Sequence, residues 1–287
     1  MFDRVLKPEI EKNDVASTQD FLQALERDDV YLPVATEVSP VSAESRIIVH
    51  TEPLSPGADR FKLVRIRLNN IQKTKKLKNL LITSPMPGDG KSTVALNLAT
   101  ALSEKGKTPV LLLEADVYRP VLVERLGLNP WPGLTECYQQ GSDPMLAIRK
   151  IDPLGFYLLP AGQAMEDGSS LLQSSFASEL INALSSSYFN WILIDSPPTT
   201  PIADILVLKA HAEATLLVAR AGKTPREAIE ETTRNLGRDH IIGIILNGVE
   251  GLDHVYSKYY GYGASEPHKK SKKSGMIEGL GLNEHEK

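Results

Sequence analysis

A short segment near residue 90 contains the residue types that bind phosphate groups. It runs from Ser84 to Thr93 and reads Ser-Pro-Met-Pro-Gly-Asp-Gly-Lys-Ser-Thr, between an apolar run and an amphipathic stretch. Such a turn directs backbone N–H groups and a helix N-terminus toward an anion. Lys91 would reach the β- and γ-phosphates of a nucleotide, and the Ser92 hydroxyl would ligate Mg²⁺. The predicted nucleotide contacts are Pro87, Gly88, Asp89, Gly90, Lys91, Ser92 and Thr93.

The match to the phosphate-binding pattern is incomplete at one position. The full P-loop has a glycine five residues before Gly90, where this chain has Pro85, so a plain strand-to-helix turn is the alternative. A dinucleotide fingerprint is excluded, because it needs a glycine where Thr93 stands. The signature lysine of the ParA/MinD partition ATPases would fall at Met86, which disfavours that subgroup.

Two further strands are expected to bring acidic side chains to the phosphate-binding turn. The apolar runs 110–113 and 191–194 are typical of parallel strands buried on both faces. The first is followed by Glu114 and Asp116, and the second by Asp195. In doubly wound sheets the ligand lies beyond the carboxyl ends of the strands. We therefore predict that Ser92, Asp116 and Asp195 hold Mg²⁺, directly or through water; an ordinary acidic loop is the alternative for 114–116.

The remaining pattern predicts the fold class. Strands are expected at 156–160, 215–219 and 241–246, and helices at 58–71, 94–102, 171–184 and 228–236. Strands that alternate with helices indicate an α/β protein with a mostly parallel, doubly wound sheet and helices on both faces, as in P-loop NTPases. Asn247 follows the last strand, where its amide could contact adenine; with Gly248 next in sequence, a turn residue is the alternative.

The two ends of the chain differ from the middle. Residues 1–45 are expected to be a flexible segment with one short helix at 18–25, and 46–50 an extended stretch. After a middle domain, 46–253, residues 254–287 are expected to be a disordered tail. The tail is rich in lysine and contains four of the nine tyrosines, which either have no role or serve as accessible phenol groups: Tyr256, Tyr259, Tyr260 and Tyr262.

Composition limits the kinds of protein that this chain can be. The 287 residues are 41% hydrophobic, enough for a full core, and the net charge of −4 argues against a nucleic-acid binder. Cys137 is the only cysteine, which favours a reducing compartment. No apolar run is long enough to span a bilayer, and the N-terminus does not look like a secretory signal. A cytoplasmic protein that reaches the membrane only through a partner is expected.

Taken together, these motifs resemble the bacterial tyrosine kinases of capsule and exopolysaccharide synthesis. Residues 87–92 resemble the Walker A motif of that family, 111–116 with Arg119-Pro120 its Walker A′ motif, and 192–198 its Walker B motif. The tail resembles its tyrosine cluster, so the similarity extends over about residues 46 to 263. Asp59-x-x-Lys62-x-x-Arg65 occupies the places of the family's Glu-x-x-Arg-x-x-Arg ring contact. From the residues alone, these three form either a solvated face or a self-association surface.

The resemblance implies ATP- and Mg²⁺-dependent autophosphorylation on tyrosine, in trans, within a ring-like homo-oligomer that regulates polysaccharide synthesis or export. It also implies a membrane co-polymerase as activator on a separate chain, and a protein-tyrosine phosphatase. Lys91 would hold the phosphates, Asp195 would assist Mg²⁺, and Asp116, or less favourably Glu114, would accept the phenol proton. Two alternatives are a ParA/MinD-like ATPase that phosphorylates no protein, and a non-catalytic, nucleotide-gated scaffold for the co-polymerase.

Overall fold

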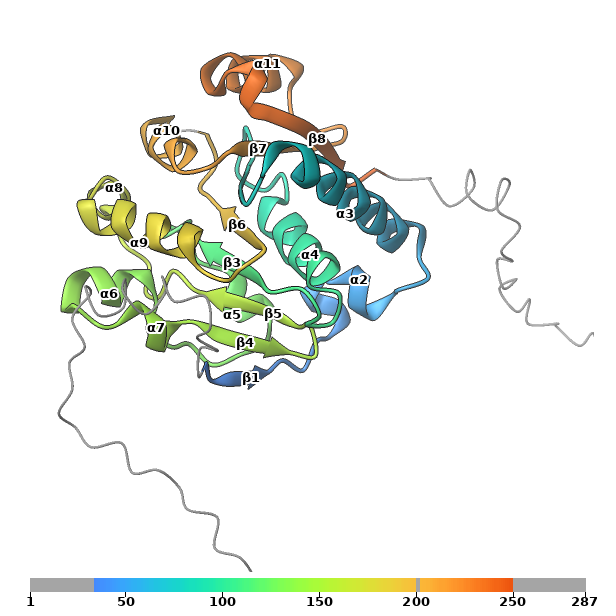
Figure 1. The fold of residues 1–287 in the computed structure, drawn as a ribbon. Helices are drawn as coiled ribbons and strands as arrows, with labels where there is room; N and C mark the ends of the chain where they lie inside the picture. Colours follow the sequence, from blue (N-terminus) through green and yellow to red (C-terminus); the bar gives the residue numbers. More distant parts are fainter. Residues whose placement is uncertain (1–33, 200–201, 250–287) are drawn as a thin grey trace, which may run out of the picture. The chain divides into compact units, whose positions relative to one another are not determined.

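The computed structural model describes residues 34–199 and 202–249, which form an eight-stranded sheet in the order β1-β4-β5-β3-β6-β2-β7-β8 (Figure 1). Every neighbouring pair is parallel except β4 and β5, which are antiparallel. This confirms the predicted mostly parallel α/β fold. The strands are β1 (Thr36–Val38), β2 (Asn79–Thr83), β3 (Val110–Glu114), β4 (Arg149–Asp152), β5 (Phe156–Leu159), β6 (Trp191–Asp195), β7 (Ala214–Arg220) and β8 (Ile241–Asn247).

Helices cover both faces of the sheet, as the alternating pattern predicts (Figure 1). Short 3₁₀ turns occupy Ala43–Ser45 and Arg238–His240. The helices are α2 (Ile48–Thr51), α3 (Pro56–Lys75), α4 (Lys91–Ser103), α5 (Leu122–Arg125), α6 (Leu134–Gln140), α7 (Pro144–Ala147), α8 (Gly168–Leu172), α9 (Ser175–Ser186), α10 (Ile202–Ala210) and α11 (Arg226–Leu236). In the part of the chain that the structure describes, no helix is long and apolar enough to cross a membrane.

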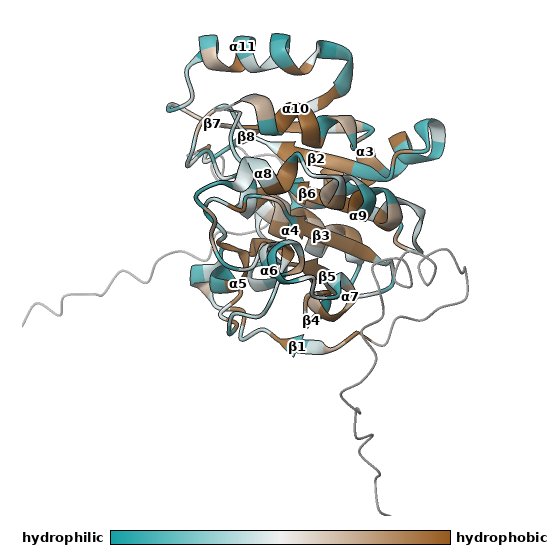
Figure 2. Ribbon diagram, turned by 90° about the vertical axis from the view of Figure 1, so that its left-hand side faces the viewer, coloured by the Kyte–Doolittle hydropathy of each residue, from teal (hydrophilic) through white to brown (hydrophobic). Residues whose placement is uncertain are grey.

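The central strands are apolar on both faces, so each face builds its own core (Figure 2). Side chains alternate along β2, so Leu81 joins the core beneath α8, α9 and α10, whereas Leu80 and Ile82 join the core beneath α3 and α4. Strands β2, β3 and β6 are buried along their whole length. In the register of the sheet, Glu114 is paired with Asp195 at the carboxyl edge. The sheet thus presents acidic residues where the Ser84–Thr93 turn begins.

Three local expectations were wrong. Residues 46–50 are not extended, because Ile47 is buried and α2 starts after it, with the Val49 N–H bonded to Asn97 Oδ1 at 3.1 Å. The helix predicted at 171–184 is two helices, because the Ser174 hydroxyl accepts from the Ala177 N–H and starts α9 anew. The segment predicted to be flexible up to residue 45 contains β1, which pairs with β4. Helix α3 is longer than predicted, since Ser55 caps it and Pro56 begins it.

Candidate functional site

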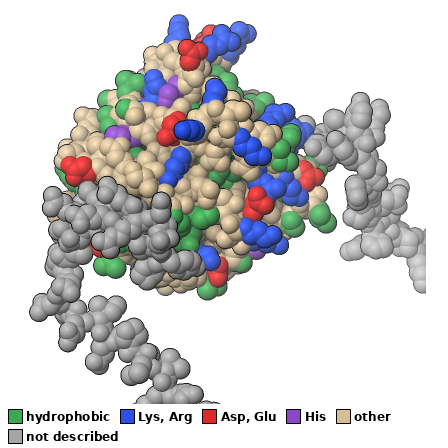
Figure 3. Space-filling model, viewed as in Figure 1, with side chains coloured by type: hydrophobic (Ala, Val, Ile, Leu, Met, Phe, Trp, Pro, Cys, Tyr) green, Lys and Arg blue, Asp and Glu red, His purple; other side chains and the backbone are tan. Residues whose placement is uncertain are grey.

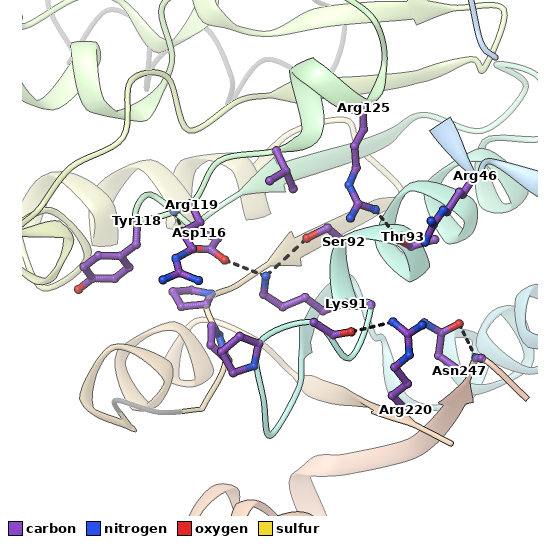
Figure 4. Close-up of a pocket in the computed structure, with 17 residues that line it drawn as sticks. Arg46, Lys91, Ser92, Thr93, Asp116, Tyr118, Arg119, Arg125, Arg220 and Asn247 are labelled. Carbon is purple, nitrogen blue, oxygen red and sulfur yellow. Dashed lines mark hydrogen bonds and ion pairs between the residues drawn. The ribbon is translucent and has the colours of Figure 1, made fainter. Parts of the chain in front are cut away.

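A pocket lies at the carboxyl edge of the sheet, around the start of α4 (Figure 4). Figure 4 shows Lys91 near its centre, Tyr118 and Arg119 on one side and Arg46 on the other. The pocket brings together most of the side chains predicted for the site. Those predicted residues that line it are Pro87, Gly88, Gly90, Lys91, Ser92, Thr93, Asp116 and Asn247. Asp89, Glu114 and Asp195 are not among its lining residues.

Two glycines shape the Ser84–Thr93 turn, which we call the phosphate loop. Gly88 and Gly90 have φ of 85° and 98°, in the left-handed region that side chains disfavour. A Cβ at Gly90 would also lie 2.0 Å from Asn247 Nδ2. That amide donates to the Asp89 carbonyl at 3.0 Å, while its oxygen accepts from the Gly248 N–H at 2.9 Å. Asn247 therefore both supports the loop and forms a turn.

Asp89 acts on the loop from outside the pocket. Its carboxylate accepts from the Met86 N–H at 3.0 Å and from the Thr224 hydroxyl at 2.7 Å, and its side chain is buried. The Asp89 side chain is therefore not a nucleotide contact as predicted, because its hydrogen bonds are used to close the turn. The loop is tied through Thr224 to the segment that follows β7.

Lys91 forms an ion pair with Asp116 inside the pocket. Its Nζ lies 2.7 Å from Asp116 Oδ2 and 3.5 Å from Ser92 Oγ. Burial lowers the pKa of Lys91, but the carboxylates of Asp195 and Asp116 outweigh burial and raise the pKa above its usual value. The lysine is thus a fixed positive charge. If Lys91 pairs with a phosphate that enters the pocket, its ion pair with Asp116 breaks and the Asp116 carboxylate becomes free.

Asp195 is a buried carboxylate that lacks hydrogen-bond partners. It ends β6 with no exposed surface, and neither oxygen has a partner among the described residues. Burial raises its pKa to about 6, although the Lys91 charge and the nearby Ser92 hydroxyl lower it. A buried polar group with no partner in a folded protein indicates an absent ion or water.

The donor set of the pocket fits Mg²⁺. The described residues contain no cluster of three His, Cys, Asp or Glu residues able to enclose a metal. Magnesium needs no such cluster, because it commonly keeps several waters and binds one or two carboxylates together with substrate phosphates. The Ser92 hydroxyl and the carboxylates of Asp116 and Asp195 are hard oxygen donors of that kind.

Glu114 has a different role from the one predicted. Its Oε1 accepts from the Val121 and Leu122 N–H groups at 2.7 and 2.8 Å, and its Oε2 accepts from the Ala161 N–H at 3.1 Å. Burial raises its pKa to about 7 despite these three bonds. With its oxygens occupied away from the pocket, Glu114 is poorly placed to accept a proton from a substrate. It joins β3 to α5 and to the end of β5, and Asp116 is the acid that reaches the pocket.

Four basic residues of the pocket were missed as site residues. Arg125 donates to the Thr93 hydroxyl, and the Arg220 guanidinium donates to the Gly88 carbonyl at 3.2 Å (Figure 4). Arg220 is the last residue of β7, and ligands of such sheets lie beyond the carboxyl ends of the strands, so its position in the sequence could have identified it. Arg46 and Arg125 follow no predicted core strand. Arg119 was named only as a member of the Walker A′-like motif, without a role in binding.

Tyr118 also lines the pocket, and a hydrogen bond to a buried carboxylate fixes its side chain. Its hydroxyl donates to Asp204 Oδ2 at 2.6 Å, and the Ser169 hydroxyl donates to Asp204 Oδ1 at 2.6 Å. Asp204 is buried at the start of α10. Burial and this hydrogen bond raise the pKa of Tyr118 to about 12, so the phenol keeps its proton. The Walker A′-like loop is therefore fastened to both α8 and α10.

The residues predicted for the oligomer contact lie on α3, away from the pocket. Asp59 and Lys62 form an ion pair at 2.8 Å, and Lys62 also donates to the Pro53 carbonyl at 2.6 Å. Arg65 lies 3.3 Å from a Glu104 oxygen. Figure 3 shows basic side chains on the side of the molecule where α3 lies. The four tail tyrosines predicted as acceptors lie outside the described residues.

The fold and the pocket define a P-loop NTPase. A model of the ParA family, described as NUBPL iron-transfer P-loop NTPase, matches residues 76–247. The chain therefore belongs to this family of P-loop NTPases, whose fold implies nucleotide binding. Met86 stands where partition ATPases have their signature lysine.

Comparison with individual proteins narrows the class further. The chain is 29% identical to the tyrosine-protein kinase YwqD of Bacillus subtilis (strain 168), over 76% of this chain and 92% of YwqD. It is 26% identical to the succinoglycan biosynthesis transport protein ExoP of Rhizobium meliloti (strain 1021), over 78% of this chain and 30% of ExoP. It matches the BceF tyrosine kinase domain with a TM-score of 0.64 and 26% identity, over 80% of this chain and 97% of that domain. The predicted resemblance to bacterial tyrosine kinases is thus confirmed.

Proposed function

We propose that this chain is an ATP-dependent protein-tyrosine autokinase that regulates the synthesis or export of a capsule or exopolysaccharide. The observation that carries the proposal is the convergence of Lys91 and Asp116, 2.7 Å apart, in a pocket at the phosphate loop, with the buried Asp195 carboxylate close enough to Lys91 to raise its pKa. The similarity to YwqD over nearly its whole length supports the kinase activity. The similarity to ExoP supports the link to polysaccharide.

In the proposed mechanism, the loop amides and Lys91 hold the phosphates of ATP. Bound Mg²⁺ would supply positive charge on the β- and γ-phosphates, and Ser92, Asp116 and Asp195 would hold it, directly or through water. Once Lys91 has turned to the phosphates, the Asp116 carboxylate can accept the proton of a tyrosine hydroxyl, whose usual pKa is about 10. The phenol oxygen then bonds to the γ-phosphorus, the bond to the bridging oxygen breaks, and ADP leaves.

The acceptors and partners are part of the same proposal. Tyr256, Tyr259, Tyr260 and Tyr262 would be phosphorylated in trans within a ring-like homo-oligomer that uses Asp59, Lys62 and Arg65. A membrane co-polymerase on a separate chain would activate the kinase at the inner face of the plasma membrane, and a protein-tyrosine phosphatase would reverse the reaction. This chain spans 30% of the length of ExoP.

Labelled ATP tests the kinase proposal. Purified protein with Mg²⁺ should acquire phosphotyrosine, and Lys91→Met should abolish it without a loss of folded structure. Lys107→Met, an exposed lysine near the opposite end of β3, is the matched control and should keep full labelling. Replacing the four tail tyrosines with Phe should remove most of the label. Undiminished phosphotyrosine in Lys91→Met would refute the mechanism.

The same assay separates the alternatives. A ParA/MinD-like ATPase, which the family match keeps in consideration, would release phosphate from ATP and acquire no phosphotyrosine. A nucleotide-gated scaffold would bind ATP with neither turnover nor label. Candidate activator peptides belong in every arm of the experiment, because an inactive kinase and a scaffold differ only in their response to activation.

A further inference from the structure

A strap formed by residues 39–51 passes beside the pocket and is anchored to the core at several points. The Ser39 hydroxyl donates to the Leu126 carbonyl at 2.6 Å, and Ile47 is fully buried. Asn97 of α4 donates to the Arg46 carbonyl at 2.8 Å and accepts from the Val49 N–H at 3.1 Å. Since α4 begins at Lys91, the strap is fastened to the helix that starts at the phosphate loop.

Arg46 has an unusual backbone conformation within this strap. It follows the 3₁₀ turn Ala43–Ser45 with φ 54° and ψ 33°, in the left-handed region that non-glycine residues seldom adopt. Such a conformation persists only where the surroundings impose it, and it is common at binding sites. Here the Asn97 bond and the buried Ile47 impose it on either side of the Arg46 carbonyl.

The conformation leaves the Arg46 side chain exposed at the pocket, in the vicinity of Thr93 (Figure 4). Within the described residues, its guanidinium has no hydrogen-bond or ion-pair partner. Two other basic groups of the pocket are already engaged: Lys91 with Asp116, and Arg125 with the Thr93 hydroxyl. Arg46 is thus a cation whose donors are available to a ligand at the phosphate loop.

We propose that Arg46 is a nucleotide-binding residue, which the strap delivers to the polyphosphate of a nucleoside di- or triphosphate beside Thr93. A guanidinium suits this role because its planar fork donates two hydrogen bonds to one phosphate group. The inference rests on the proposed nucleotide binding and adds a contact from a segment outside the phosphate loop.

A consequence follows for the strap itself. If Arg46 contacts the nucleotide only when the strap is docked, nucleotide binding must stabilise docking, and docking must tighten nucleotide binding by the same factor. Only four residues separate the strap from α3, which carries the proposed oligomer contact. Occupancy of the pocket would therefore be communicated to the start of α3.

Binding of Mg²⁺–ADP to the full chain tests the proposal, because ADP supplies phosphates without turnover. Arg46→Asn removes the guanidinium and suits the left-handed backbone, and it should raise the Kd measured by calorimetry about tenfold or more. Arg46→Lys, which restores the charge without the fork, should recover part of the affinity. Arg67→Asn removes an exposed arginine of α3 outside the pocket lining, and its Kd should stay within about twofold of the parent value.

Hydrogen exchange provides the second measurement. ADP should slow amide exchange across residues 42–51 in the parent chain and in Arg67→Asn, and should do so much less in Arg46→Asn. Equal Kd values for Arg46→Asn and Arg67→Asn, or equal protection of the strap by ADP in both, would overturn the inference. If the parent chain binds no ADP, the proposed function fails instead, which separates the two failures. Thermal unfolding without nucleotide verifies that Arg46→Asn is folded.

Discussion

Asp195→Asn is expected to make the nucleotide-free protein more stable at neutral pH while it weakens nucleotide binding. The Asp195 carboxylate is fully buried, and neither oxygen has a partner at normal hydrogen-bond distance among the described residues, although the Ser92 hydroxyl is near enough to lower its pKa. A charge in that position costs free energy that a bound metal would offset. Replacing the carboxylate with a neutral amide should therefore remove this free-energy cost from the folded, ligand-free protein.

The size of the effect follows from the pKa. Burial raises the pKa of Asp195 from 3.8 to about 6 in the folded chain. Between these values the folded state holds the proton more tightly than the unfolded state, so stability falls as pH rises through this window. With 1.36 kcal/mol per pKa unit, the penalty above pH 6 is at most roughly 3 kcal/mol. The penalty is absent below the unfolded pKa, and the neutral amide of Asn never incurs it.

Urea denaturation at several pH values between 3.5 and 7.5 measures this difference. The stability of Asp195→Asn relative to the parent should rise with pH by about 1–3 kcal/mol, mainly between pH 4 and 6. Asp204→Asn is the matched control, since Asp204 is equally buried but accepts hydrogen bonds from Tyr118 and Ser169. That variant should lose about 1–3 kcal/mol at pH 7. A relative stability of Asp195→Asn that is independent of pH would refute the reasoning.

Three further variants address other parts of the structure. Glu114→Asp should lower the free energy of unfolding by about 1–3 kcal/mol, because the shorter side chain cannot reach all three N–H groups; unchanged urea denaturation would contradict this. Gly90→Ala should impair ADP binding more than Gly88→Ala, because both glycines have positive φ but only a Cβ at Gly90 meets Asn247; equal losses by calorimetry would count against this account. Arg65→Ala should cost under about 1 kcal/mol of stability yet reduce the sedimenting mass of a ring, and an unchanged mass would remove Arg65 from the oligomer contact.

The central part of the fold could be predicted because its strands have a simple local signature. Strands β2, β3 and β6 are covered on both faces, so they appear in the sequence as continuous apolar runs. Strands at the margin have no such signature: β4 contains Arg149 and Lys150, and β1 has three residues of which none is fully buried. These strands form because a neighbouring strand offers unpaired backbone groups, and this depends on tertiary contacts.

The acids Glu114 and Asp116 also show what the sequence could and could not predict. Glu114 and Asp116 are two residues apart and were expected to act at one place, but only Asp116 reaches Lys91. Glu114 is still within β3 and accepts from the N–H groups of three residues that follow it by between 7 and 47 positions. The loop turns beyond the strand, so the alternation of side chains no longer applies to Asp116.

Residue order alone predicts the phosphate loop, the buried parallel strands and the acids at their ends. It could do so because a P-loop binds phosphate mainly through consecutive backbone groups, and because a strand buried on both faces must be apolar along its length. Three outcomes emerge only in the folded chain: Asp89 and Glu114 brace the backbone, the Asp195 carboxylate lacks a hydrogen-bond partner at normal distance, and Arg46 reaches the pocket. Each of these outcomes depends on contacts between segments far apart in the chain, which no local pattern of residues encodes.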